Sequence, residues 1–130
     1  MAGRKLSKAE LLRGVNELSE YPAVLVPVKE GGYSVVFPNF AKLTAYGSKR
    51  EHAVQAGREM LSAHLVGLVA EGEAPPRPSD PARLIPDEDE PLGTELVSIK
   101  PDRKAILKRL GLEKDQTRGL AMAHLGRLGK

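Results

Sequence analysis

The sequence contains no cysteine, and this absence excludes disulfide bonds and metal sites built on thiolates. It is also compatible with a reducing compartment. No apolar run approaches the length of a membrane-spanning helix, and the charged start of the chain is followed by no apolar stretch of the signal-peptide kind. These features predict a soluble, cytoplasmic protein.

The sequence also has little of the equipment of an enzyme. It contains no Gly-x-Ser-x-Gly motif, and Glu30-Gly31-Gly32 leads into a strand-like run, whereas a phosphate-binding loop opens a helix. The three histidines, His52, His64 and His124, share no metal-ligand spacing. His52 is expected to be exposed, and His64 falls on an apolar helical stripe, which favours a packed residue over a general base. We therefore expect no catalytic residue, no metal and no cofactor; the least favoured alternative is a small hydrolase using His64 or the Asp87–Glu90 run.

The positive charge is small and unevenly placed along a chain of one domain's length. The 130 residues carry a net charge of +3, and residues 21–74 are neutral, with five basic and five acidic residues. Residues 75–99 carry two basic against six acidic residues, whereas residues 100–130 carry nine basic against three acidic. A basic tail suits phosphate or an acidic partner, although a solvated helix face is the commoner cause.

What the sequence does contain is an α+β pattern between residues 21 and 73. Residues 23–28, 33–37 and 42–46 are predicted strands with short links, which form an antiparallel meander. Gly31 and Gly32 predict a tight hairpin between the first two. Pro22 and Pro27 favour an edge position for the first strand, or a bulge at Pro27.

One long amphipathic helix should follow the strands, from a capping box at Ser48–Glu51 to about residue 71, where Gly72 ends it. Its buried stripe is marked by Val54, Leu61, Leu65 and Leu68. Gly57 lies on that stripe, where glycine costs about 1 kcal/mol relative to alanine. The compensation predicted for it is a close approach of helix to sheet, in a two-layer core.

An additional helix is predicted before this unit. Ser7 and Glu10 form a capping box, and apolar residues at helical spacing follow it to residue 19. A helix this short does not stand alone in water, so its stripe should dock on the core or serve as an oligomer contact.

The chain after the long helix reads as a linker followed by a helical tail. Residues 75–93 contain six prolines and the Asp87–Glu90 run, which predicts an extended linker that is not a packed element. The acidic run reads as a solvated loop, with a decoy for a basic partner or a metal site as alternatives. Residues 95–100 form a predicted fourth strand, and a short helix capped by Asp102 and a second helix from about residue 112 to 125 follow.

The basic tail offers weak signals for nucleic acid. Ala105 and Gly111 lack helix-turn-helix spacing, whereas a strand followed by two helices has the element order of a ribbon-helix-helix. If residues 95–100 complete the core sheet, however, they cannot also form the ribbon. The basic residues of the tail would then be phosphate contacts: Lys100, Arg103, Lys104, Lys108 and Arg109.

Residues 21–79 resemble the HicB family, the antitoxins of HicA–HicB toxin–antitoxin pairs. The matching pieces are Tyr21-Pro22-Ala23-Val24, Gly31-Gly32-Tyr33-Ser34-Val35, Phe37-Pro38-Asn39-Phe40, Tyr46-Gly47-Ser48, Glu51-His52-Ala53, and Leu68 to Glu73 leading to Pro75-Pro76-Arg77-Pro78-Ser79. The resemblance implies a β-β-β-α-β core likened to a partial ribonuclease H fold without its catalytic acids. The domain layout is then an N-terminal helical extension at 1–20, a HicB-like domain at 21–100 and a basic helical tail at 101–130. Where the family continues with a Pro-Gly-Cys-like turn, this chain has Phe40-Ala41-Lys42-Leu43.

What the resemblance implies about function is a non-enzymatic partner of a small basic RNA-cleaving toxin. The antitoxin core would bind the toxin stoichiometrically, and the basic tail would bind the operon's promoter DNA, in a homodimer or larger assembly. Tyr33, Phe40 and Tyr46 are the expected partner-binding residues, whereas Phe37 is better placed in the core. The alternative is an orphan module of the same fold that acts as an interaction protein or a DNA-binding regulator without a toxin.

Overall fold

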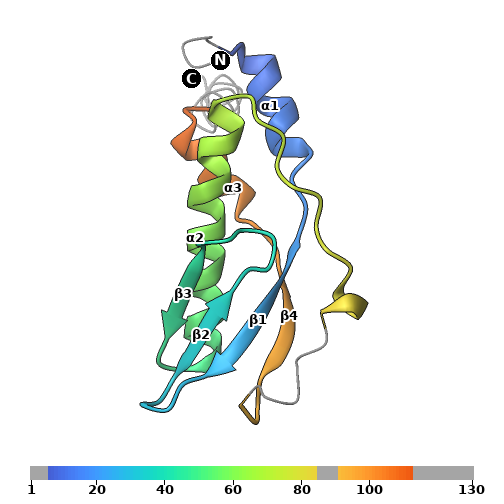
Figure 1. Cartoon of the computed structure of the whole chain (residues 1–130). Coiled ribbons are helices and arrows are strands. Elements are labelled where there is room, and N and C mark those ends of the chain that lie inside the picture. The colour runs from blue at the N-terminus through green and yellow to red at the C-terminus, as the bar shows by residue number, and fades with distance from the viewer. Residues whose placement is uncertain (1–5, 85–90, 113–130) are drawn as a thin grey trace, which may run out of the picture.

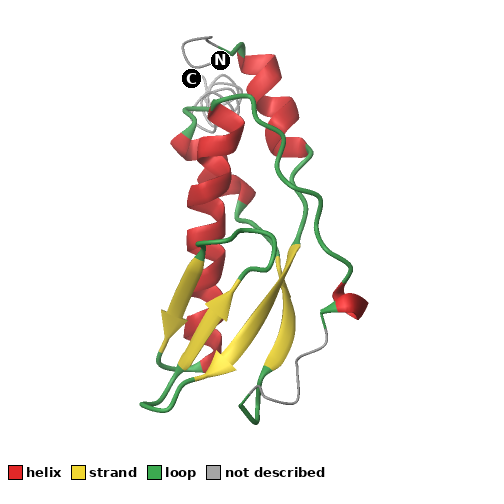
Figure 2. Cartoon of the chain, in the orientation of Figure 1, coloured by secondary structure: helices red, strands yellow, loops and turns green. Residues whose placement is uncertain are grey.

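The computed structural model describes residues 6–84 and 91–112, which form an α+β unit with one four-stranded antiparallel sheet (Figures 1 and 2). The elements are α1 (Lys8–Asn16), β1 (Tyr21–Pro27), β2 (Tyr33–Val36), β3 (Thr44–Gly47), α2 (Arg50–Ala70), a short 3₁₀ helix η1 (Pro81–Arg83), β4 (Glu95–Ile99) and α3 (Arg103–Arg109). The predicted order of elements is confirmed up to α3. The second tail helix, His124 and the Asp87–Glu90 run lie outside the described residues.

The sheet has the strand order β3-β2-β1-β4, and every neighbouring pair is antiparallel. β1, β2 and β3 form the predicted meander, and the turn between β1 and β2 uses Gly31 and Gly32 at φ +105° and +88°. β4 returns from the far end of the chain to pair with β1, with Tyr21 opposite Ile99. The predicted fourth strand is therefore part of the core sheet.

The prediction that β1 is an edge strand is wrong, because β1 lies between β2 and β4. Val28 donates its N–H to Gly32 on the β2 side, so even-numbered residues of β1 direct their N–H toward β2 and odd-numbered residues direct it toward β4. Pro22 therefore faces the β2 side, where β2 ends opposite Val24, and Pro27 faces the β4 side, where β4 ends opposite Leu25. Each proline occupies a position at which the strand has no neighbour to receive the missing N–H.

α2 begins one residue later than predicted and without a capping box. Lys49 is the N-cap, and no side chain bonds to the first turn. The start of the helix depends instead on Gly47, because a Cβ there would lie 2.1 Å from the Ala53 nitrogen. Only glycine allows β3 to run this closely into the helix.

The buried stripe of α2 repeats every fourth residue: Ala53, Gly57, Leu61, Leu65 and Val69. It is rotated from the predicted stripe, in which Val54 and Leu68 had central places. A Cβ on Gly57 would lie 3.1 Å from both Val35 Cγ1 and Ile99 Cδ1, which confirms the predicted close approach of helix to sheet.

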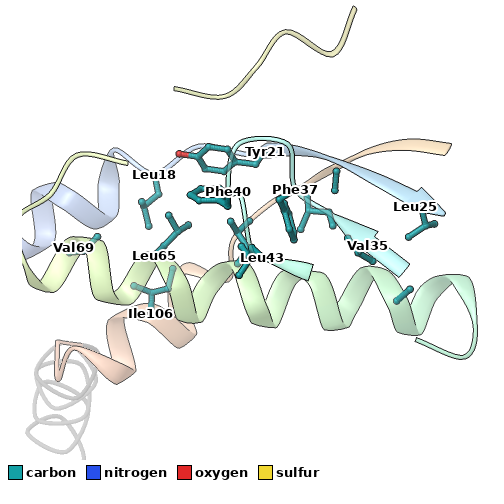
Figure 3. Packing of buried hydrophobic residues seen from close by; sticks show 14 of the residues in the cluster. Leu18, Tyr21, Leu25, Val35, Phe37, Phe40, Leu43, Leu65, Val69 and Ile106 are labelled. Atoms are coloured by element: carbon teal, nitrogen blue, oxygen red, sulfur yellow. The ribbon is translucent and has the colours of Figure 1, made fainter. Parts of the chain in front are cut away.

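The core lies between α2 and the sheet and continues under α1 and α3 (Figure 3). Tyr21, Phe37 and Leu65 fill its middle, and Ile106 of α3 is fully buried against α2. The predicted capping box of α1 is present: the Ser7 hydroxyl accepts from the Glu10 N–H at 3.1 Å, and the Glu10 carboxylate accepts from the Ser7 N–H at 2.8 Å. α1 ends at Asn16, three residues before the predicted end.

The first part of the proline-rich linker, residues 75–84, is bonded to the core, and we call it the strap. Tyr21 Oη donates to the Pro76 carbonyl at 2.6 Å. The Asn39 side-chain amide donates to the Arg77 carbonyl at 3.1 Å and to Ser79 Oγ at 3.0 Å, and its oxygen accepts from the Ser79 N–H at 3.1 Å. The prediction of an unpacked linker is therefore wrong for this part, because Tyr21 of β1 and Asn39 of the β2–β3 loop bond to three of its residues.

Candidate partner-binding surface

The face of the sheet turned away from α2 presents a row of apolar side chains. Because side chains alternate along a strand, the residues that do not point to α2 share this second face. Val24 lies opposite Val36 on one side and opposite Leu96 on the other, so the three form one row across β2, β1 and β4. Val36 is 40% exposed, and Val24 and Leu96 are half-buried. We call this set, with Val26 and Tyr46, the open sheet face.

Tyr46 is the most exposed aromatic residue of the described chain, at 55%. Its hydroxyl donates to the Gly31 carbonyl at 2.7 Å, so the ring is fixed beside the β1–β2 turn. A Cβ on Gly32 would lie 2.5 Å from that hydroxyl, which makes glycine necessary at this place. The open sheet face therefore contains a rigid, amphipathic ring of the kind favoured at interfaces.

The structure does not bring the three predicted partner-binding residues together. Only Tyr46 lies on the open sheet face. Tyr33 is half-buried and directed to the α2 side of the sheet, in the register of the buried Val35. Phe40 is 7% exposed, and its ring makes edge contacts with Tyr21 at 4.9 Å and His64 at 5.0 Å between ring centroids.

His64 lies at the surface and not in the packed position predicted for it. Its neighbours Leu61 and Leu65 occupy the buried side of α2, and the rotation of the stripe leaves His64 exposed with one edge against Phe40. The ring lines a shallow groove between the β2–β3 loop and the end of α2, together with Leu68 and other residues. His52 is exposed, as predicted.

The predicted nucleic-acid contacts lie at the surface, but one of them has bonds within the protein. Lys100, Lys104, Lys108 and Arg109 are exposed at the end of β4 and along α3. Arg103 instead donates to the Leu18 carbonyl at 2.9 Å and to the Asn16 carbonyl at 3.3 Å. Since β4 is in the core sheet, it does not serve as the ribbon of a ribbon-helix-helix in this fold.

An ion pair between Arg50 and Glu95 joins the start of α2 to the start of β4. Arg50 Nε donates to Glu95 Oε1 at 3.0 Å, and Arg50 Nη2 bonds the second carboxylate oxygen. This hydrogen bonding, aided by the charge of the guanidinium, lowers the pKa of Glu95, and the carboxylate raises the pKa of Arg50. No local pattern could have predicted the pair, because 45 positions separate its members.

The described residues contain neither a metal-binding cluster nor a helix able to span a membrane. Among residues 6–84 and 91–112, no three histidine or acidic side chains lie close enough to hold a metal ion. Within the same residues, no helix combines the length and apolar character that crossing a bilayer requires.

No family model matches the sequence, and no curated protein is significantly similar to it. Solved structures, in contrast, are similar in fold. The antitoxin HicB of Burkholderia pseudomallei is 19% identical with a TM-score of 0.56, over 67% of this chain and 66% of that one, slightly under two thirds of its length.

Two toxin–antitoxin complexes also contain similar chains. One chain of the toxin–antitoxin complex from Streptococcus pneumoniae is 21% identical with a TM-score of 0.59, over 82% of this chain and 97% of that one. One chain of the HicA3 and HicB3 toxin–antitoxin complex is 26% identical with a TM-score of 0.51, over 65% of this chain and 99% of that one. The resemblance predicted from residues 21–79 is confirmed, and the chain has the fold of these antitoxin structures.

Proposed function

From a fold shared with the HicB antitoxins, we propose that this chain is an antitoxin-like protein of the cytoplasm. It neutralises a small, basic, RNA-cleaving toxin by stoichiometric binding, without catalysis and without a cofactor. The observation that carries the proposal is the likeness to chains of two toxin–antitoxin complexes, which spans 97% and 99% of those chains. As part of the proposal, the chain assembles as a homodimer or a larger homo-oligomer.

The open sheet face is the toxin-binding surface in this proposal. It carries an apolar row, Val36–Val24–Leu96, and the fixed ring of Tyr46, and such a combination of aliphatic and aromatic side chains suits the centre of an interface. Of the predicted partner-binding residues, Tyr46 is therefore the one we place at the centre. Tyr33 and Phe40 would support the surface from the sheet and the core.

Co-expression with the neighbouring gene tests the proposal. The chain should rescue growth from the toxin and co-purify with it in a fixed ratio; absence of both complex and rescue would contradict the proposed function. Val36→Lys should then weaken binding, because it places a charge in the apolar row and repels a basic partner.

A matched control separates the surface from the fold. Met60 on α2 is 42% exposed, similar to the 40% of Val36, so Met60→Lys introduces the same change away from the sheet. Met60→Lys should bind as the unchanged chain does. If Val36→Lys also binds normally, the open sheet face is not the toxin-binding surface.

A second candidate function, autoregulation through DNA binding, rests on the exposed basic residues around α3. Lys104, Lys108 and Arg109 are all exposed, and Lys100 lies at the end of β4. The same property supports the alternative of a DNA-binding regulator without a toxin. Deletion of 101–130 is a poor test, because it would remove the fully buried Ile106.

Charge removal within the intact chain gives a cleaner result. A double substitution, Lys104→Ala with Lys108→Ala, should weaken binding to upstream DNA in a mobility shift and reduce its salt dependence, since two phosphate contacts are lost. An unchanged shift and salt slope would exclude α3 as the DNA-binding element.

A further inference from the structure

Among the residues that the structure describes, no strand or loop bonds to the outer edge of β4. Odd-numbered residues of β1 direct their N–H toward β4, so their partners Glu95, Val97 and Ile99 form the ladder with β1. Leu96 and Ser98 therefore direct both N–H and C=O away from the sheet. Among the residues that the structure describes, none bonds to these four groups.

The chemistry of this edge favours a second strand. Natural proteins discourage edge pairing with lysine, proline or bulges, and β4 contains none of these from Glu95 to Ile99. Its one charged residue, Glu95, is neutralised by Arg50. The other edge strand, β3, is one residue shorter and has an exposed lysine beyond each end, Lys42 and Lys49, whereas β4 has one at a single end, Lys100.

We propose that β4 pairs with β4 of a second copy of this chain, across a two-fold axis at Val97, to form one continuous eight-stranded sheet. In this register Leu96 of each copy lies opposite Ser98 of the other, and all four free groups of each strand are used in four hydrogen bonds. Glu95 lies opposite Ile99, so no like charges face each other. A two-fold axis makes the contact self-complementary and closed.

The pairing deepens the homo-oligomer of the proposed function by naming its surface, and it does not depend on a toxin. It leaves the apolar row of each copy free on the open sheet face. Its failure and the failure of toxin binding are therefore separate results.

Cross-linking tests the register directly, because the chain has no cysteine of its own. In the proposed register, Val97 lies opposite Val97 of the second copy in a non-hydrogen-bonded pair, whose Cα atoms are about 4.5 Å apart. This distance is within the range of a disulfide, so Val97→Cys should give a disulfide-linked dimer under mild oxidation. Ala45→Cys on β3 is the matched control, because Ala45 has the same place on the other edge strand and should remain uncross-linked. Cross-linking through Ala45→Cys alone, or through neither variant, overturns the proposal.

A backbone substitution provides the second measurement. Ser98→Pro removes an outward N–H and leaves the bonds between β1 and β4 intact, so two hydrogen bonds per dimer are lost. Analytical ultracentrifugation should show that the dissociation constant of the dimer rises roughly tenfold or more. Ser98→Ala keeps the N–H and removes only the hydroxyl bond to Glu20, so it should stay dimeric. Equal dimer stability in Ser98→Pro and Ser98→Ala, or a monomeric unchanged chain, would overturn the pairing.

Discussion

The guanidinium of Arg103 donates a hydrogen bond to the carbonyl oxygen of Leu18 at 2.9 Å, and this bond ties α3 to the segment between α1 and β1. Arg103 also donates to Asn16, whose carbonyl lies at the open end of α1. The residue thus provides a donor for one of the carbonyls that a helix end leaves without partners, that of Asn16, and a second donor for Leu18 beyond the helix. From the sequence alone, its place among the basic residues of α3 predicts a phosphate contact.

Arg103→Ala should lower the free energy of unfolding by about 1 kcal/mol, since hydrogen bonds from an exposed charged group are lost. Urea denaturation of the purified chain measures the change. Lys104→Ala removes a neighbouring exposed charge and should stay within about 0.5 kcal/mol. Equal effects of the two substitutions would show that the bonds to Leu18 and Asn16 contribute no stability.

Gly47→Ala should destabilise the protein by about 3 kcal/mol or more, because its Cβ would lie 2.1 Å from the Ala53 nitrogen and force α2 away from β3. At Gly67 on the same helix, a Cβ would meet no atom within 4 Å, so Gly67→Ala should stabilise by about 0.5–1 kcal/mol. Thermal unfolding followed by circular dichroism should therefore shift in opposite directions for the two variants. A normal melting temperature for Gly47→Ala would contradict the close approach.

Asn39→Ala should release the strap, because three hydrogen bonds to Arg77 and Ser79 are lost. The expected loss is about 2 kcal/mol, and trypsin should cleave faster after Arg83, which lies within the strap. Ser79→Ala keeps the backbone N–H that bonds to Asn39, so its effect should be smaller. Equal cleavage rates in all three proteins would show that Asn39 does not hold the strap.

The Arg50–Glu95 pair should make stability depend on pH in the acid range. The pKa of Glu95 is lowered in the folded protein, so folding stabilises its ionised form. This contribution is fully present above the ordinary glutamate pKa of 4.5 and is lost as pH falls through the lower, folded-state pKa.

Glu95→Gln should therefore be less stable than the unchanged chain near neutral pH, with the difference narrowing on acidification. Urea unfolding at a series of pH values from neutral to about 3 measures it. Because both side chains are about half-exposed, high salt should also reduce this difference in stability. A difference that is constant across this pH range would show that the carboxylate's charge is not its source.

Much of the fold could be predicted from local patterns. The alternation of Tyr33, Val35 and Phe37, the two turn glycines, the Ser7 cap and the Asp102 cap depend on residues within a few positions of each other. The close approach of α2 to the sheet at Gly57 could also be predicted, because a glycine on the apolar stripe of a helix needs a compensating contact. These elements needed no knowledge of the rest of the chain.

The errors have a common physical origin in partners distant along the chain. The prolines of β1 indicate an edge strand. β1 nevertheless lies inside the sheet, because β2 and β4 each overlap only part of it and leave the two prolines without a neighbouring strand. The strap could not be predicted because Asn39 and Ser79, which bond to each other, are 40 positions apart. The expected partner-binding aromatics do not share one surface, because the face of the sheet on which each lies depends on the strand pairing. The predicted burial of His64 is wrong because the contact of Gly57 with the sheet sets which side of α2 is buried, and His64 is not on that side.

Tyr21 holds the chain at two distant points: its hydroxyl bonds Pro76, and its backbone lies opposite Ile99. Bringing β4 to β1 requires the closure of a long loop, and the entropy lost on closure grows with loop length. Once the strap is bonded to Tyr21 and Asn39, the remaining loop is only the stretch from Ser79 to β4. The strap therefore divides the closure of one long loop into the closure of two shorter ones. Its bonds should increase the rate at which β4 joins the sheet.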